Sequence, residues 1–151
     1  MCGLAGFYGI ADSLTAIRLQ RLALYNRDRG NESGGIAVEG TIYKKAIDPV
    51  LFFTDSKVVK LLNTVKKSRV ILHTRQSTTG KVIDKNAHPF KKGRWIYAHN
   101  GIINNYLAID NTVNVDSQVI GKLLDDGGLK GLEKLQGGFA IPFYSIKNNS
   151  L

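Results

Sequence analysis

The chain has 151 residues, of which 43% are hydrophobic and 22% charged, and its formal net charge at pH 7 is +9. This length predicts a single domain over residues 1–151, with enough apolar side chains to fill one core. No apolar run approaches the roughly 18–20 residues that span a bilayer, and the N-terminus has no charged region followed by an apolar stretch, so we expect a cytoplasmic protein without membrane association. The single cysteine excludes an internal disulfide.

Strands and helices alternate in the first half of the predicted structure. Residues 4–10 read as a strand, and Asp12 or Ser13 can cap a helix that follows. That helix places four apolar side chains on one face: Leu14, Ile17, Leu22 and Tyr25. Residues 36–38 and 41–47 predict a hairpin across Glu39-Gly40, ended by Asp48-Pro49, and residues 56–65 show the spacing of a second helix.

In the second half, polar residues follow directly after short apolar strands. The buried strand 70–72 ends in His73–Arg75, and the strand 95–98 leads to Asn100. The intervening segment 76–93 is polar and could fold over a ligand. A helix follows Asp116, a short one covers 129–135, and a last strand covers 139–146, which Pro142 should confine to an edge or a bulge because proline cannot donate to a ladder.

The only cysteine, Cys2, lies directly after Met1. Cysteine is small enough for an aminopeptidase to remove the methionine, which would give one residue both a thiol and a free α-amine. The amine, with a reference pKa of about 7.7–8.0, could act as the base for its own side chain. Alternatively, Cys2 is only a small residue after the start of translation, and its thiol packs as a small apolar group.

Polar blocks farther along the chain favour the role of Cys2 as a nucleophile. They are Arg29–Ile36, His73–Gly80, Asn86–Phe90, His99–Asn105 and Asp116–Ile120. Their order and spacing resemble the class II glutamine amidotransferases, whose glutaminase domain is an N-terminal-nucleophile hydrolase. The resemblance runs from Cys2 to about Phe139.

The resemblance implies hydrolysis of the side-chain amide of L-glutamine. Cys2 would attack the carbonyl carbon, its amine would carry the proton to the departing ammonia, and water would release glutamate from the thioester. The oxyanion would be held by the amide of Asn100 and the backbone N–H of Gly101. Taken alone, however, Asn-Gly is also the strongest short signal for a type I′ hairpin turn.

The resemblance also implies residues that bind the amino-acid end of the substrate. Arg75 would pair with the α-carboxylate, which a planar guanidinium can meet with two parallel hydrogen bonds. Asp116 would receive the α-ammonium, although Asp is also a preferred helix N-cap. Thr78 and His88 fall in the family's substrate-binding region. The remaining histidines, His73 and His99, are interpreted as structural.

Some positions depart from the family pattern. Arg29 and Gly30 begin a turn that in the family shapes the pocket near the nucleophile, and Glu32 stands where an aspartate is usual. Gln76 and Ser77 replace a tryptophan and an alanine common in several members, and Thr79 replaces a frequent histidine. We expect these changes to affect selectivity more than the reaction itself.

The fold implied by the resemblance is α+β: a four-layer αββα sandwich of two stacked antiparallel sheets, shortened at the C-terminus. The chain is then either a minimal version or a fragment of a longer protein, and an exposed sheet edge could be covered in a homo-oligomer. No cofactor and no metal are implied. The expected partners are L-glutamine and a separate synthase that accepts the ammonia.

Two other functions are compatible with the sequence. One is the same chemistry on another γ-glutamyl amide. The other is a non-catalytic structural or nucleic-acid-binding module that uses the basic surface, since a net charge of +9 suits an acidic partner. The lysines and arginines are nevertheless spread along the chain without a long block, which is typical of a solvated surface.

Overall fold

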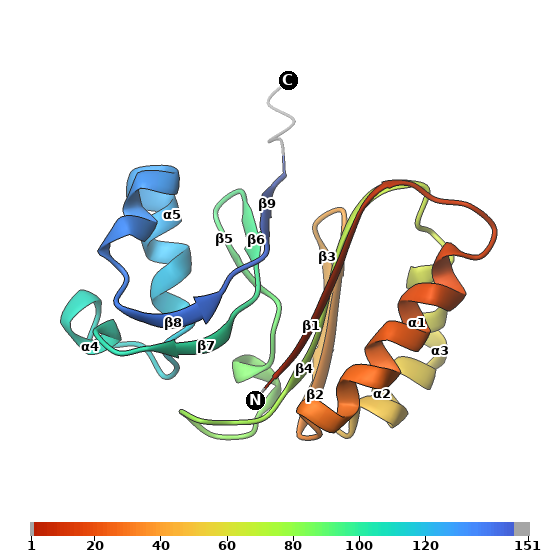
Figure 1. The fold of residues 1–151 in the computed structure, drawn as a ribbon, viewed down its shortest axis with the longest axis horizontal. Helices are drawn as coiled ribbons and strands as arrows, with labels where there is room; N and C mark the ends of the chain where they lie inside the picture. The colour runs from red at the N-terminus through yellow and green to blue at the C-terminus, as the bar shows by residue number, and fades with distance from the viewer. Residues whose placement is uncertain (1, 147–151) are drawn as a thin grey trace.

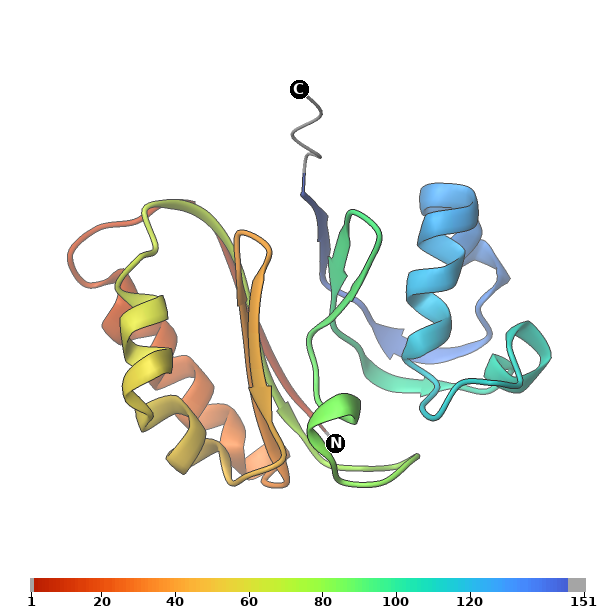
Figure 2. The same cartoon turned by 180° about the vertical axis from the view of Figure 1, so that it is seen from behind.

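The computed structural model describes residues 2–146. These residues form four layers. Three helices cover one face of a four-stranded sheet, a second group of strands lies against the other face, and one long helix covers that group (Figures 1 and 2). The α+β architecture with two antiparallel sheet layers is therefore confirmed. None of the helices within residues 2–146 combines the length and apolarity that crossing a bilayer requires.

The first sheet has the strand order β1-β4-β2-β3, and all its neighbours are antiparallel. Its strands are β1 (Gly3–Ile10), β2 (Ser33–Val38), β3 (Thr41–Lys45) and β4 (Lys67–Arg75). The helices that cover it are α1 (Thr15–Tyr25), α2 (Pro49–Thr54) and α3 (Ser56–Leu62), with the 3-10 turn η1 (Asn26–Arg29) after α1.

The second layer of strands consists of two small antiparallel sheets. One has the order β5-β6-β9, with β5 (Phe90–Lys92), β6 (Trp95–Tyr97) and β9 (Phe143–Ser145). The other pairs β7 (Asn100–Ile103) with β8 (Gly137–Ala140). The helices of this half are α4 (Tyr106–Ile109) and α5 (Gln118–Gly131), and the 3-10 turns are η2 (Asp84–Asn86) and η3 (Leu132–Lys134).

Three clusters of buried apolar side chains fill the three spaces between layers. One, around Phe52 and Leu72, lies between the first sheet and its helices. Another, around Ile103 and Ile120, lies beneath α5. Between the sheets the cluster is small: Ala37, Ile71, Ile96 and Ala98. Buried polar side chains, among them His73, His88 and His99, occupy another part of this interface.

The predicted hairpin of the first half is confirmed, with Val38 opposite Thr41 and positive φ at both Glu39 and Gly40. Asp48-Pro49 does more than end it, because together they begin α2. The Asp48 carboxylate accepts the N–H of Val50 at 2.8 Å, and proline occupies the first helical turn. This helix was not predicted, although its N-terminal signal is present in the sequence.

The four apolar side chains predicted to share one face of α1 lie on its exposed side. Leu14, Ile17, Leu22 and Tyr25 are 49%, 50%, 47% and 79% exposed. The helix instead buries Thr15, Leu19 and Ala23. Apolar residues surround much of this helix, so the sequence pattern allowed either face. The small side chains of the buried face permit close packing on the sheet and on α2.

The last predicted strand, 139–146, is divided in two. β8 pairs with β7, β9 pairs with β6, and Ile141 and Pro142 lie between them. Pro142 lacks an N–H, but its carbonyl accepts the N–H of Ala98 at 3.1 Å, at the point where the chain passes from one small sheet to the other.

Helix boundaries also differ from the prediction. The second predicted helix ends at Leu62 instead of residue 65. The predicted helix 129–135 begins inside α5, beyond a kink at Gly128, whose φ is 57°. Glycine tolerates that backbone conformation without the steric cost of a side chain.

Candidate functional site

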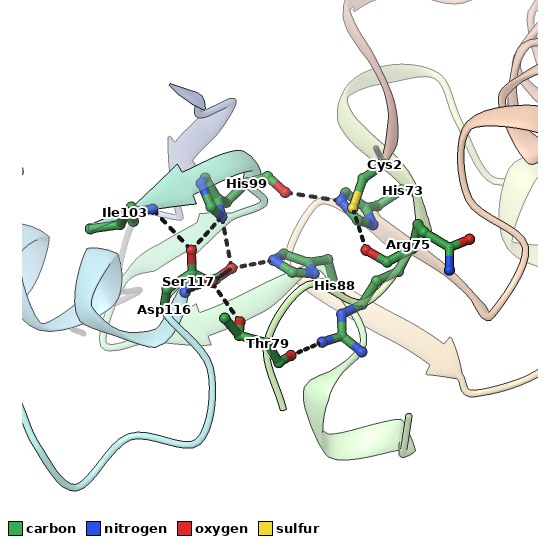
Figure 3. A network of polar contacts seen from close by, with 10 residues as sticks. Cys2, His73, Arg75, Thr79, His88, His99, Ile103, Asp116 and Ser117 are labelled. Atoms are coloured by element: carbon green, nitrogen blue, oxygen red, sulfur yellow. Dashed lines mark hydrogen bonds and ion pairs between the residues drawn. The ribbon is translucent and has the colours of Figure 1, made fainter. Parts of the chain in front are cut away.

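The site lies where the C-terminal end of β4 meets β7 and the start of α5 (Figure 3). Along β4, Val70 and Leu72 belong to the core beneath the helices, whereas Ile71 belongs to the core between the sheets. Because side chains alternate along a strand, His73 and Arg75 also face the second sheet layer. They are 1% and 4% exposed.

All three histidines of the chain gather in this interface. The rings of His73 and His88 stack with centroids 4.3 Å apart. Nε2 of His73 donates to the carbonyl of His99 at 3.0 Å, so this nitrogen carries the proton. The Ser117 hydroxyl lies 2.8 Å from Nε2 of His88 and 2.9 Å from Nδ1 of His99. The cluster therefore ties the first sheet, the 76–93 segment and the N-terminal end of α5 together.

Burial disfavours the charged form of these imidazoles. It lowers the pKa of His73 to about 3 and the pKa of His88 well below its usual value. Burial also lowers the pKa of His99, although the neighbouring Asp116 carboxylate opposes this shift. All three rings are neutral at pH 7 and act as hydrogen-bonding and packing groups.

The Asp116 carboxylate is 4% exposed and already accepts several hydrogen bonds. Its Oδ2 accepts the N–H of Ile103 at 3.0 Å, and its Oδ1 accepts the N–H of Ser117 at 2.9 Å and the hydroxyl of Thr79 at 3.2 Å. The interpretation of Asp116 as an N-cap is wrong, because the N-cap of α5 is Ser117. Asp116 instead connects α5 to β7 and to the 76–93 segment.

The Arg75 guanidinium lies on the other side of the same narrow space. Its Nη2 donates to the carbonyl of Thr79 at 2.5 Å. Its Nη1 is buried and has no hydrogen-bond partner among the described residues. Burial lowers the pKa of this guanidinium, but arginine stays charged at pH 7. An unpaired, buried N–H of a cation is well suited to an anionic ligand.

Cys2, just before β1, is half-buried, and its thiol lies 3.5 Å from the carbonyl of Gln76. Burial raises the pKa of the thiol, and the nearby Arg75 charge partly opposes this. Nε of Arg29 donates to the Cys2 carbonyl at 3.1 Å. A Cβ at Gly30 would lie 2.5 Å from the carbonyl carbon of Arg75, so only glycine permits this close approach.

Asn100 and Gly101 form the start of β7, opposite Ala140 and Phe139. The interpretation of this pair as a hairpin turn is therefore wrong. Gly101 has a φ of +140°, and a Cβ there would lie within 2.6 Å of the Cα of Phe139. Both the backbone conformation and the contact with β8 require a glycine at this position.

Cys2 lies at the boundary of two cavities. A wide cleft of about 680 Å³ is lined by Cys2, Gln76, Thr78, Asn100, Gly101, Ile102, Asn104, Gly138, Phe139 and Ala140. A narrow pocket of about 20 Å³ is lined by Cys2, Arg75, Gln76, Thr78, Thr79, His88, His99, Gly101, Val115, Asp116 and Ser117. The narrow pocket has room for about one water molecule.

The predicted site residues are thus largely brought together. Cys2, Thr78 and Gly101 line both cavities. Asn100 lines only the wide cleft, whereas the narrow pocket alone includes Arg75, His88 and Asp116. Neither cavity is lined by Arg29 or Gly30, which instead contact the backbone of Cys2 and of Arg75.

The roles of Ser117 and Glu32 were not predicted from the sequence. Ser117 joins two histidines, and its place directly after Asp116 was the available signal. The Glu32 carboxylate accepts the amide N–H of Gln76 at 3.0 Å and the backbone N–H of Ser77 at 2.5 Å. The longer side chain at position 32 thereby fixes the segment that follows β4.

The 76–93 segment is also attached to the edge of the first sheet. Nζ of Lys44 donates to the carbonyl of Ala87 at 2.5 Å and lies over the ring of Phe90 at 4.2 Å. The Asp84 carboxylate accepts the N–H of Ala46 at 2.7 Å. Burial lowers the pKa of Lys44 to about 8.

Within residues 2–146, no cluster of His, Cys, Asp and Glu side chains has the arrangement of a metal site.

The chain matches a known protein family. The family model of the class-II glutamine amidotransferases matches residues 28–122, more than half of the chain. The chain therefore belongs to this family of enzymes, and the resemblance noted in the sequence is confirmed.

Two curated relatives are glutamine–fructose-6-phosphate aminotransferases (isomerizing). The one from Bartonella quintana (strain Toulouse) is 33% identical over 93% of this chain and 26% of the relative. The one from Aquifex aeolicus (strain VF5) is 30% identical over 97% of this chain and 28% of the relative. The chain thus spans roughly a quarter of the length of these relatives.

Solved structures share the fold. The glutamine phosphoribosylpyrophosphate (PRPP) amidotransferase from B. subtilis complexed with ADP and GMP superimposes with a TM-score of 0.70 at 19% identity, over 96% of this chain and 35% of that chain. The structure of the allosteric regulatory enzyme of purine biosynthesis gives a TM-score of 0.70 at 21% identity over the same shares. These likenesses confirm the N-terminal-nucleophile-hydrolase type of fold.

Proposed function

We propose that this chain is a single glutaminase domain that hydrolyses the side-chain amide of L-glutamine to glutamate and ammonia. The observation that carries the proposal is that Cys2, Arg75, Gly101 and Asp116 line one pocket although they are far apart in sequence. A nucleophile, a cation, a backbone N–H donor and a carboxylate are the groups that amide hydrolysis of a zwitterionic amino acid requires.

In this mechanism the Cys2 α-amine, exposed by removal of Met1, takes the proton of the thiol as sulfur attacks the amide carbon. Burial raises the thiol pKa, so the thiol is protonated at neutral pH and needs such a base. The amine then gives the proton to the leaving ammonia, and water hydrolyses the thioester. Asn100 and Gly101 donate to the oxyanion, each donor being worth about 3–4 kcal/mol in the transition state.

The amino-acid end of glutamine would occupy the space between Arg75 and Asp116. The unpaired Nη1 of Arg75 supports a role in binding the α-carboxylate. Because the narrow pocket is about 20 Å³, binding requires the Thr79 carbonyl to release Arg75 and the segment around Thr78 and Thr79 to move outward. In the bound state we assign His88 to the wall of this pocket. Arg29 and Gly30 would determine the shape of the pocket.

The ammonia would pass to a separate synthase in the cytoplasm. The relatives' name makes fructose 6-phosphate the first acceptor to test. A homo-oligomer would cover exposed sheet edges such as β1, where Tyr8 and Ile10 are 84% and 82% exposed.

The test is glutamate release from glutamine by the full chain, after mass spectrometry has established that Cys2 is the first residue. Two controls separate the roles of thiol and amine. Cys2→Ala removes the thiol, and an uncleaved N-terminal extension blocks the amine while keeping the thiol. Both should lose activity. Undetectable glutamate release by correctly processed protein, with and without a candidate synthase, would refute the proposal.

A further inference from the structure

Two cavities of very different size meet at Cys2. The narrow one, about 20 Å³, carries Arg75 and Asp116, and the wide one, about 680 Å³, carries Asn100. In the proposed function, which this inference requires, the glutamyl part of the substrate lies in the narrow pocket. The wide cleft then receives what leaves from the amide carbon.

The wall of the wide cleft is the β7–β8 ribbon, and its surface is mostly apolar. Ile102 is 51% exposed, and Ala140, on the same face of the ribbon, is also exposed. Gly138, opposite Ile102, adds to the space, because a Cβ built there has no neighbour within 4 Å. The cleft is also lined by polar side chains, among them Asn100 and Thr78.

Ammonia as a leaving group needs almost none of this space. A volume of about 680 Å³ lies in the range of pockets that bind small organic molecules through apolar walls and a few polar groups. A substituent on the amide nitrogen would lie against Ile102 and Ala140 and would bury their exposed surface, which is favourable in proportion to the apolar area removed from water.

We propose that the wide cleft binds the amine part of γ-glutamyl amides of apolar primary amines, and that the chain hydrolyses them. The Cys2 sulfur bonds to the γ-carbonyl carbon, the C–N bond breaks, and the amine departs with the proton that the thiol lost. Water then cleaves the thioester and releases glutamate. The reaction consumes one amide and one water and yields glutamate and one amine.

The experiment compares substrates that all release a primary amine but differ in the apolar surface of that amine. The probes are the γ-methylamide and the γ-n-butylamide of L-glutamate, with γ-glutamyl-β-alanine as a chain of similar length that ends in a carboxylate. The enzyme is the full chain with Cys2 shown to be the first residue. We expect kcat/KM for the butylamide to exceed that for the methylamide and for the β-alanine amide by at least tenfold.

Variants test whether the cleft itself provides the preference. Gly138→Leu fills the open space, so the ratio of kcat/KM for butylamide to methylamide should fall toward one. Gly127→Leu is the matched control, because a Cβ at Gly127, on α5, also meets nothing within 4 Å but lies outside the cleft. It should keep the wild-type ratio. If Gly138→Leu does not fold, Ile102→Thr removes apolar contact while retaining a β-branched strand residue.

The outcomes separate this inference from the proposed function. Hydrolysis of glutamine with equal values for methylamide and butylamide, or with no hydrolysis of either, overturns the inference and leaves the proposed function intact. An unchanged ratio in both cleft variants also overturns it. Failure to hydrolyse glutamine and all three amides by processed enzyme overturns both.

Discussion

Nε2 of His73, on β4 of the first sheet, donates a hydrogen bond to the carbonyl of His99 at 3.0 Å, immediately before Asn100 of β7. The bond crosses the interface between the two layers of strands. It fixes the peptide group that leads into Asn100, and it requires His73 to be neutral with its proton on Nε2. The histidine cluster therefore links the stability of the interface to the geometry of the candidate oxyanion site.

Stability should fall steeply in mild acid. A histidine in the unfolded chain titrates near pH 6.5, whereas the pKa of His73 in the folded chain is about 3. Between these values the unfolded state binds more protons, so the free energy of unfolding decreases as the pH decreases. Each such histidine contributes up to about 1.4 kcal/mol per pH unit. Urea unfolding at pH 7.5, 6.5 and 5.5 measures the slope. His73→Gln should reduce it, and a flat profile from 7.5 to 5.5 would contradict neutral burial.

Ser117→Ala should destabilise the protein and disturb the site. The hydroxyl serves both His88 and His99, and its removal leaves buried ring nitrogens without that partner. A buried polar group that loses its partner costs about 1–3 kcal/mol. Denaturant unfolding measures the loss, and Ser13→Ala, at an exposed position, is the control. A change below about 0.5 kcal/mol would show that the hydroxyl does not hold the cluster.

Gly30→Ala should lower activity more than its size suggests. The new methyl group would lie 2.5 Å from the Arg75 carbonyl carbon and 2.7 Å from the Gln76 nitrogen, so the end of β4 has to shift. Misplacement of a binding group by about 1 Å can reduce the rate about 100-fold. Glutaminase kcat/KM measures the effect, and Gly127→Ala, with open space at its Cβ, should retain wild-type activity. Equal activity of the two variants would argue against the tight contact.

Arg75→Lys should raise the KM for glutamine while the chain still folds. Lysine keeps the charge but cannot meet a carboxylate with two parallel N–H groups in a planar arrangement. Loss of a charge-assisted hydrogen bond of about 1.5–3 kcal/mol corresponds to roughly a 10–100-fold rise in KM. Arg21→Lys on the exposed side of α1 is the matched control. A KM within twofold of wild type would exclude Arg75 as the carboxylate anchor.

The sequence alone predicted the family, the layered α+β fold and the residues gathered around Cys2. These features depend on local signals, since Cys2, Arg75, Gly101 and Asp116 each lie in a polar block beside a predicted strand or helix. The hairpin at Glu39-Gly40 was predictable for the same reason, because a turn depends on a few adjacent residues.

Only the tertiary structure decided which face of α1 is buried, since apolar residues occur around much of the helix and the choice depends on α2 and the sheet. It also decided that residues 139–146 divide between β7 and β6, because strand partners are distant in sequence. The same holds for the Ser117 hydroxyl between His88 and His99 and for the Thr79 carbonyl on Arg75. Such contacts join segments that approach only when the two sheets stack, so no local pattern encodes them.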